Sequence, residues 1–186
     1  MYQAILSDPT FFSLLFRFDQ DLAEATRRAG CDCGGRLDVA NYGRKPRGGP
    51  EGLPAAFDLR LSFCCATDGC RKRATPPSVR FVGRRVYFMA IFVLVSAMRH
   101  GVNRKRETQL RALFGPSRRT LERWLRWWRE AFPQTRLWRE ATGRFSPPVD
   151  MAALPQSLLE RFSGRDEPTR VHRALAFLAP LGVAHS

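Results

Sequence analysis

Residues Val86 to Met98 read VYFMAIFVLVSAM and form the one long apolar run of the chain. A membrane span needs about 20 apolar residues, so this run is too short to cross a bilayer. A helix that is apolar on nearly every side must be buried. The run therefore predicts a buried helix that packs against neighbouring helices and against a cysteine-rich segment upstream.

Two further helices are predicted directly after this run. Residues Glu107 to Trp128 read ETQLRALFGPSRRTLERWLRWW, and Gly115-Pro116 divides them with a tight turn. Ser117 is placed to cap the second helix. An apolar stripe at i, i+3, i+4 and i+7 is formed by Leu121, Trp124, Leu125 and Trp128. With the buried run, these helices predict a three-helix helix-turn-helix unit over residues 83–133.

The opposite side of the second helix is mostly basic and carries Arg118, Arg119, Glu122, Arg123, Arg126 and Arg129. In helix-turn-helix units the N-terminal residues of the second helix enter the major groove, where arginine can pair with guanine through two hydrogen bonds. The predicted DNA contacts are Ser117, Arg118, Arg119, Thr120, Arg123 and Arg126. An ordinary helical hairpin with a solvated basic face is the open alternative.

Upstream, residues 31–35 read CDCGG and residues 63–70 read FCCATDGC. Four thiolates can close a tetrahedral structural zinc site, and glycines permit the tight turns that bring two sulfurs to one metal. Adjacent strand residues face opposite ways, so Cys64 and Cys65 are not expected to bind the same ion. Cys65 shares parity with Leu59, Leu61 and Phe63, which we expect to face the core. The predicted zinc ligands are Cys31, Cys33, Cys65 and Cys70, although Cys64 in place of Cys65 and free thiols without metal stay open.

These cysteines define a small β zinc ribbon, predicted over residues 31–82. The alternation around Leu59 to Phe63 indicates one strand, and Ser78 to Phe81 indicates a second. Between them and the first cysteine pair, residues 41–54 read NYGRKPRGGPEGLP, which favours a turn-rich connection.

Helices are predicted on both sides of these two units. In residues 1–30, an amphipathic helix begins at Pro9 after Asp8 and ends before Gly30. In residues 134–186, Pro147 and Pro148 mark a linker, followed by short helices at Leu154 to Phe162 and Thr169 to Leu178. The predicted fold class is α+β, mainly α, with a zinc ribbon, a three-helix helix-turn-helix unit and flanking helices.

The chain has 186 residues and 31 Lys plus Arg against 17 Asp plus Glu, which gives a formal charge of +14. Such an excess indicates a polyanion as partner, and nucleic acid is the leading class. Arginine enrichment through GC-rich codons is the alternative explanation. The start, Met1 to Ser7, has no basic region and no cleavage site, which predicts no secretory signal. We therefore expect a cytoplasmic protein whose cysteines bind metal rather than form disulfides. DNA binding would make it nucleoid-associated.

The cysteine ribbon, the joining segment RATPPSVRF (73–81), the apolar helix and GPSRRTLERW (115–124) together resemble the N-terminal region of bacterial insertion-sequence transposases. The resemblance covers about Cys31 to Phe132. It implies DNA recognition, because strand transfer in that family belongs to a separate RNase-H-like domain with three metal-binding carboxylates. The residues after Phe132 are too few for such a domain. We therefore expect no enzymatic activity.

Three hypotheses follow. The first is sequence-specific binding of duplex DNA, with the ribbon supporting the helical unit. The second is a zinc-stabilised adaptor that recruits a transposase or another protein of a mobile element or transcription complex. The third, and least favoured, is RNA binding through aromatic residues of the ribbon. No membrane partner is expected.

Overall fold

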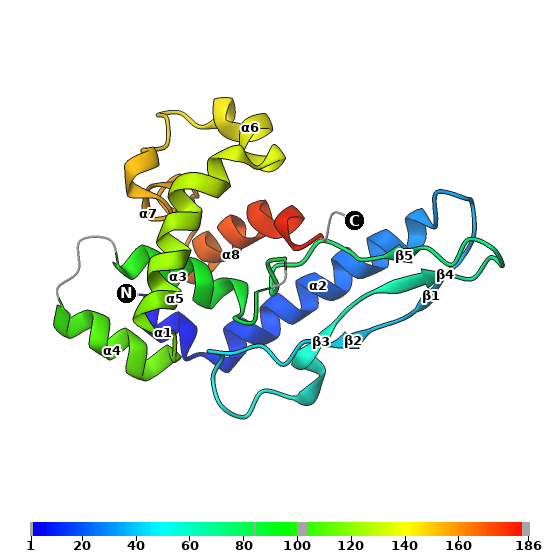
Figure 1. Ribbon diagram of the computed structural model, residues 1–186, viewed down its shortest axis with the longest axis horizontal. Coiled ribbons are helices and arrows are strands. Elements are labelled where there is room, and N and C mark those ends of the chain that lie inside the picture. The colour runs from blue at the N-terminus through cyan, green and yellow to red at the C-terminus, as the bar shows by residue number, and fades with distance from the viewer. Residues whose placement is uncertain (1, 84, 100–103, 184–186) are drawn as a thin grey trace.

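The computed structural model describes residues 2–83, 85–99 and 104–183. It is α+β and mainly helical, with two small sheets. The helices are α1 (Tyr2–Leu6), α2 (Pro9–Ala29), α3 (Met89–Arg99), α4 (Arg104–Phe114), α5 (Arg118–Arg126), α6 (Arg136–Ala141), α7 (Gln156–Leu159) and α8 (Glu167–Leu178). The strands are β1 (Leu37–Val39), β2 (Tyr42–Gly43), β3 (Leu59–Arg60), β4 (Phe63–Cys65) and β5 (Arg73–Ala74). Most helices gather at one end, while α2 and the strands project from them as an arm (Figure 1).

The long helix α2 has the ends that the sequence predicts. Asp8 is its N-cap and accepts a hydrogen bond of 2.8 Å from the Thr10 amide. Pro9 occupies the first turn, where backbone amides have no acceptor within the helix, so that the helix loses no hydrogen bond through the missing amide proton of proline. Gly30, with φ of +76°, ends the helix, because a residue with a Cβ rarely adopts that conformation.

The apolar run forms the centre of the main core. Every residue from Phe88 to Val95 is at most 2% exposed, which confirms the predicted burial. Helices α1, α4, α5 and α7 surround α3. However, α3 begins at Met89 rather than Val86, and the cysteine-bearing strands lie away from it in the arm (Figure 1). The part of the predicted ribbon that does pack on this run is the segment before it, where Phe81 stacks on Phe88.

The three-stranded sheet of the arm has the order β1-β4-β5 and is antiparallel throughout. Leu37 pairs with Cys65 and Val39 with Phe63, so the register sets the first cysteine segment beside the second. The other sheet pairs β2 with β3. One strand through Leu59 to Phe63 was expected, but β3 and β4 belong to different sheets.

This division also reverses the expected side-chain orientation at the start of that segment. Leu59 is 37% exposed, whereas Arg60 is 1% exposed. The Arg60 guanidinium is buried because it donates to the carbonyl oxygens of Pro76 and Gly182. The prediction that Leu59 faces the core is therefore wrong, while Phe63 and Cys65 are buried as expected.

The strand predicted at Ser78 to Phe81 is also absent, and this segment is buried irregular backbone. Side chains satisfy three of its amides, and the Ser78 amide donates to the Ala179 carbonyl at 3.2 Å rather than to a neighbouring strand. The Asp19 carboxylate of α2 accepts hydrogen bonds from the Val79 amide at 2.7 Å and the Ser78 hydroxyl at 2.6 Å. The Ser78 hydroxyl accepts from the amides of Arg80 and Phe81.

Asp19 also forms a buried ion pair. Arg80 Nε donates to Asp19 Oδ2 at 2.8 Å, and both side chains are at most 1% exposed. The remaining Arg80 nitrogens donate to the carbonyl oxygens of Phe57 and Leu59 at 2.8 and 2.9 Å. Burial lowers the pKa of Arg80, and Asp19 opposes that shift. The pair thus joins α2, the segment before β3 and the segment that enters α3.

The C-terminal half adds a helical layer over α3. The predicted helix at Thr169 to Leu178 is confirmed as α8, with Asp166 as its N-cap. The helix predicted at Leu154 to Phe162 is shorter, because α7 has only four residues and follows Pro155. Helix α6 was not anticipated from the sequence. Among the described residues, no helix has both the length and the apolarity to cross a membrane.

Replacing Asp19 by Asn should destabilise the whole fold, because the buried Arg80 guanidinium would lose its counter-charge. The expected loss is roughly 3–5 kcal/mol in the free energy of unfolding. Urea unfolding followed by tryptophan fluorescence measures it. Glu24→Gln is the matched control on the same helix, since Glu24 pairs with Arg28 at an exposed site. Equal unfolding midpoints for the two variants would contradict this role for Asp19.

Candidate metal centre and basic helix face

Two tight turns bring the cysteines of the arm together. The first follows α2: the Gly34 amide donates to the Cys31 carbonyl at 2.7 Å, and the Cys31 amide donates to the Gly35 carbonyl at 3.0 Å. The second follows β4: the Thr67 amide donates to the Cys65 sulfur at 3.4 Å, and the Cys70 amide donates to the Thr67 carbonyl at 3.2 Å. Each turn presents two sulfurs on the same side.

The four predicted sulfurs form one group. Sγ of Cys31 lies 3.7 Å from Sγ of Cys70, and Sγ of Cys33 lies 3.5 Å from Sγ of Cys65. All four sulfurs lie within 4.8 Å of one another. A tetrahedral ion with metal–sulfur bonds of about 2.3 Å needs sulfurs about 3.8 Å apart, whereas a disulfide bond measures about 2.05 Å. The spacing therefore fits a shared metal ion and not disulfides.

Cys64 lies outside this group, and its sulfur donates to the Arg71 carbonyl at 3.3 Å. The choice between Cys64 and Cys65 depended on strand parity. That argument succeeds within β4, where Phe63 and Cys65 share a buried face, although it fails at Leu59.

Gly35 is the position where the cluster needs a glycine. A Cβ atom there would lie 2.2 Å from Thr67 Oγ1, 2.7 Å from Cys65 Sγ and 3.2 Å from Cys33 Sγ. Hydrogen bonds from the Gly35 amide and the three neighbouring thiols lower the pKa of the Cys33 thiol to about 6, whereas the pKa of Cys31 and that of Cys70 are raised within the same cluster. The thiolate is the form that binds metals. Gly35 thus provides the space that the four sulfurs need.

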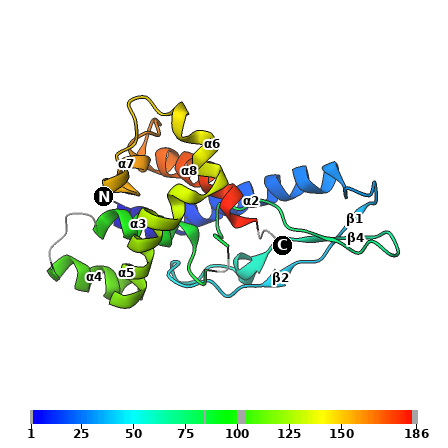
Figure 2. The same cartoon turned by 45° about the horizontal axis from the view of Figure 1, so that its top comes forward.

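The sheet that holds the cysteines has its own small core, formed by Ala23, Leu37, Phe63 and Cys65. This core is separate from the main core around α3. The strands β1 and β4 lie at one end of the molecule and α5 lies at the other in both views (Figures 1 and 2). The cysteine-bearing strands therefore do not touch α5, and the predicted ribbon (residues 31–82) meets the helical unit only through other parts, such as Phe57, Val79 and Phe81, which lie in the main core.

Helix α5 is held firmly on its inner side. Leu110 and Phe114 of α4 and Leu121 and Trp124 of α5 are all buried, as predicted. The turn between the helices is attached to the segment before α3, because the Tyr87 hydroxyl donates to the Gly115 carbonyl at 3.3 Å. Ser117 caps α5 by accepting from the Thr120 amide.

The predicted contact residues share the outer side of α5 and its cap, but they are not equally available. Arg118 is paired with Glu122 at 2.9 Å. The hydroxyls of Ser117 and Thr120 lie 3.0 Å apart and bond to each other. A shallow cavity of about 670 Å³ lies along this face and is lined by Arg118, Arg119, Glu122, Arg123 and Arg126. Arg119, Arg123 and Arg126 are also exposed on this face. The Arg123 side chain in addition borders a second cavity on the flank of α5.

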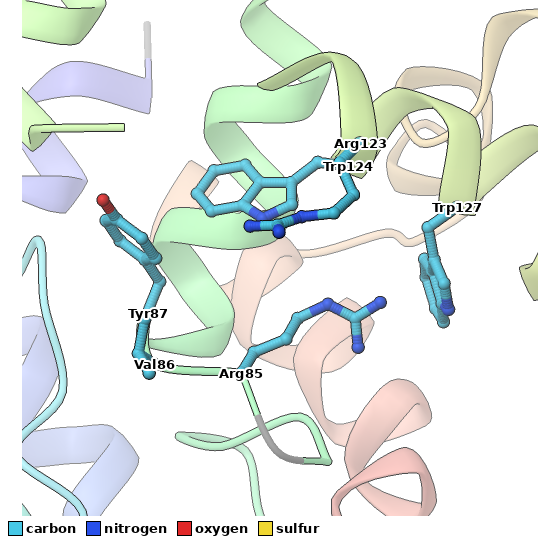
Figure 3. Close-up of a pocket in the computed structure, with 6 residues that line it drawn as sticks. All are labelled: Arg85, Val86, Tyr87, Arg123, Trp124 and Trp127. Atoms are coloured by element: carbon cyan, nitrogen blue, oxygen red, sulfur yellow. The ribbon is translucent and has the colours of Figure 1, made fainter. Parts of the chain in front are cut away.

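A second cavity, of about 450 Å³, lies on the flank of α5 and was not predicted (Figure 3). It is lined by Arg85, Val86, Tyr87, Arg123, Trp124 and Trp127. Sequence periodicity does not predict it, because Val86 and Tyr87 lie within the run that predicts a buried helix. Arg85 simply precedes the apolar run.

Comparison of this chain with known proteins finds no matching protein family, no similar curated protein and no similar solved structure. The functional conclusion therefore depends on the geometry of the cysteine cluster and of the α5 face.

Replacing Gly35 by Ala should weaken metal binding, because the added methyl group would displace Thr67 and the sulfur of Cys65. By analogy with changes that disturb the surroundings of metal ligands, the expected loss in affinity is roughly 10- to 100-fold. Titration with Co²⁺, followed by its thiolate absorption bands, measures the affinity. Gly43→Ala is the control, since nothing lies within 4 Å of an added Cβ there. Equal Co²⁺ affinity for both variants would show that Gly35 does not shape the site.

Proposed function

We propose that this protein is a non-catalytic DNA-binding protein that contacts duplex DNA through α5 and holds a structural zinc ion in its cysteine arm. The observation that carries the proposal is the outer face of α5. Arg119, Arg123 and Arg126 are exposed there on one side of a helix whose other side is anchored in the main core.

The spacing of these arginines suits a groove. Positions i, i+4 and i+7 lie along one side of an α-helix over about 10 Å. A major groove about 12 Å wide accepts a helix in this orientation. Arg119 lies in the first turn of α5, where helix-turn-helix units make their base contacts. We assign base recognition to Arg119 and backbone contacts to arginines farther along the helix.

The other predicted contacts have supporting roles in this proposal. Ser117 and Thr120 fix the start of α5 through the cap, where their hydroxyls bond to each other. Arg118 must leave Glu122 before it can contact DNA, and an exposed ion pair of this kind contributes little energy. We therefore assign Arg118 a smaller contribution than Arg119.

Zinc is the ion that fits the arm best. Four thiolates in a tetrahedron are typical of structural zinc sites, and they leave no open position for a substrate. Cys31, Cys33, Cys65 and Cys70 would hold the ion and join the end of α2 to the sheet. The zinc would stabilise the arm rather than α5, because the two lie at opposite ends of the molecule (Figure 2).

The order of cysteine pairs, joining segment, apolar helix and α4–α5 hairpin supports kinship with the recognition region of insertion-sequence transposases. The proposed role is that of such a module acting without a strand-transfer domain. Its partners would then be duplex DNA and, at the arm or the C-terminal helices, a transposase or another protein.

Selection from a random duplex library should yield a preferred sequence, and Arg119→Ala should relax that preference. Each lost arginine–guanine contact removes about 1–3 kcal/mol of discrimination. Fluorescence polarisation against the selected duplex, a scrambled duplex, single-stranded DNA and RNA measures it. Arg139→Ala, at an exposed site on α6, is the control. Equal affinity of the wild-type protein for selected and scrambled duplexes at physiological salt would refute sequence-specific binding.

Elemental analysis should find one zinc ion per chain, retained in Cys64→Ser and lost in Cys65→Ser. Removal of zinc by a chelator should expose the chain at Arg71 to Arg73 to trypsin, because these residues adjoin Cys70 in the arm. Tryptophan fluorescence should change little, since Trp124, Trp127, Trp128 and Trp138 all belong to the main core or pack on it. Equal zinc content in the two variants would refute the assigned ligand set. Zinc without binding to any nucleic acid would favour the adaptor hypothesis.

A further inference from the structure

The cavity beside α5 contains two arginines and three aromatic side chains. Arg85 enters it from the segment before α3 and Arg123 from α5 (Figure 3). Its walls are Tyr87, Trp124 and Trp127, with Trp124 packed edge-to-face on Tyr87 at 5.0 Å between ring centroids. The volume of about 450 Å³ lies in the range of ordinary small-ligand sites.

Arg85 is held in a defined position by aromatic rings. Its guanidinium lies 4.5 Å from the centroid of the Phe92 ring and 4.4 Å from that of Trp127. Among the ion pairs of the described residues, none involves Arg85 or Arg123. Burial and the nearby charge of Arg123 lower the pKa of Arg85 to about 10. At neutral pH, two like charges thus share this cavity without a carboxylate.

We propose that this cavity binds a phosphate group, held between the guanidinium groups of Arg85 and Arg123. Guanidinium groups donate paired hydrogen bonds that match phosphate oxygens, and an anion would relieve the repulsion between the two arginines. The aromatic walls strengthen this attraction because they lower the local dielectric constant.

The position of the cavity indicates where the phosphate comes from. Arg123 borders both this cavity and the shallow cavity along the outer face of α5. A duplex that places base edges against Arg119 would bring its backbone to this flank of the helix. The phosphate is thus a DNA phosphodiester, and this assignment rests on the proposed DNA binding. Contacts to the backbone position a protein on DNA without reading sequence. Arg85 therefore fixes the register of α5 and does not choose the bases.

The test compares Arg85→Gln, Arg85→Lys and the control Arg27→Gln in the metal-loaded full chain. Arg27 is exposed near the end of α2, at the opposite end of the molecule from α5.

The first experiment measures DNA binding by polarisation titrations of the selected and scrambled duplexes at several salt concentrations. We expect Arg85→Gln to bind both duplexes several-fold more weakly with an unchanged ratio. The slope of log K against log salt should fall by about 0.9, the value for one lost phosphate contact. Arg85→Lys should recover part of the affinity, because it keeps the charge.

The second experiment uses inorganic phosphate alone. Phosphate at fixed ionic strength should raise the melting temperature of the wild-type protein and of Arg27→Gln more than that of Arg85→Gln, because a ligand stabilises the state that binds it. A duplex affinity and salt slope that do not change in Arg85→Gln would overturn the phosphodiester assignment and leave the proposed DNA binding intact. A protein that binds no duplex but retains the Arg85-dependent response to phosphate would refute DNA binding and support a site for free phosphate. If Arg85→Gln changed neither the affinity for duplex DNA nor the response to phosphate, the phosphate site itself would be overturned.

Discussion

The ion pair between Asp19 and Arg80 is the interaction on which the arrangement of the other elements depends. A buried carboxylate and a buried guanidinium must be paired, since neither can be left alone in an apolar interior. Asp19 binds the segment 78–80, Arg80 binds the carbonyls of Phe57 and Leu59, and the Arg80 carbonyl accepts from the Met89 amide at the start of α3. The arm, the joining segment and the central helix therefore share one polar junction.

The junction separates two regions with different sources of stability. The main core is formed by large apolar and aromatic side chains around α3, including the stacked rings of Phe92 and Trp128. The core of the arm contains only four buried residues, one of them Cys65. So small an apolar core contributes little, and a structural metal is a common substitute in small modules. The cysteine cluster stands where the apolar surface is insufficient, which is a physical reason for its position.

Those features that arise from local periodicity and local turns could be predicted from the sequence. The ends of α2, the burial of α3, the α4–α5 hairpin and the four clustered cysteines follow from helix spacing, capping residues and strand parity. The burial of Arg60 could not be predicted, because its partners are the carbonyls of Pro76 and Gly182, distant in sequence. The irregular segment at 78–81 differs from the predicted strand for the same reason, since its amides bond to the Asp19 carboxylate of α2, the Ser78 hydroxyl and the Ala179 carbonyl. The cavity at Arg85 exists only when α3 and α5 are packed together.

The positions of the arginines also bear on whether their abundance has a function. A codon bias would add arginines wherever a charged side chain is tolerated, and several lie in exposed pairs one helical turn from a glutamate, at Arg28, Arg118 and Arg136. Such pairs are nearly neutral for stability. Arg85 differs, because it is a half-buried cation beside a second cation, and the rings of Phe92 and Trp127 rather than a carboxylate stabilise its charge. The two rings hold Arg85 in place, and a bound phosphate would offset the repulsion between Arg85 and Arg123. The arginines of this protein would therefore act in two ways. Arg85 and Arg123 would bind one phosphate group, and the overall positive charge would attract a polyanion to the surface.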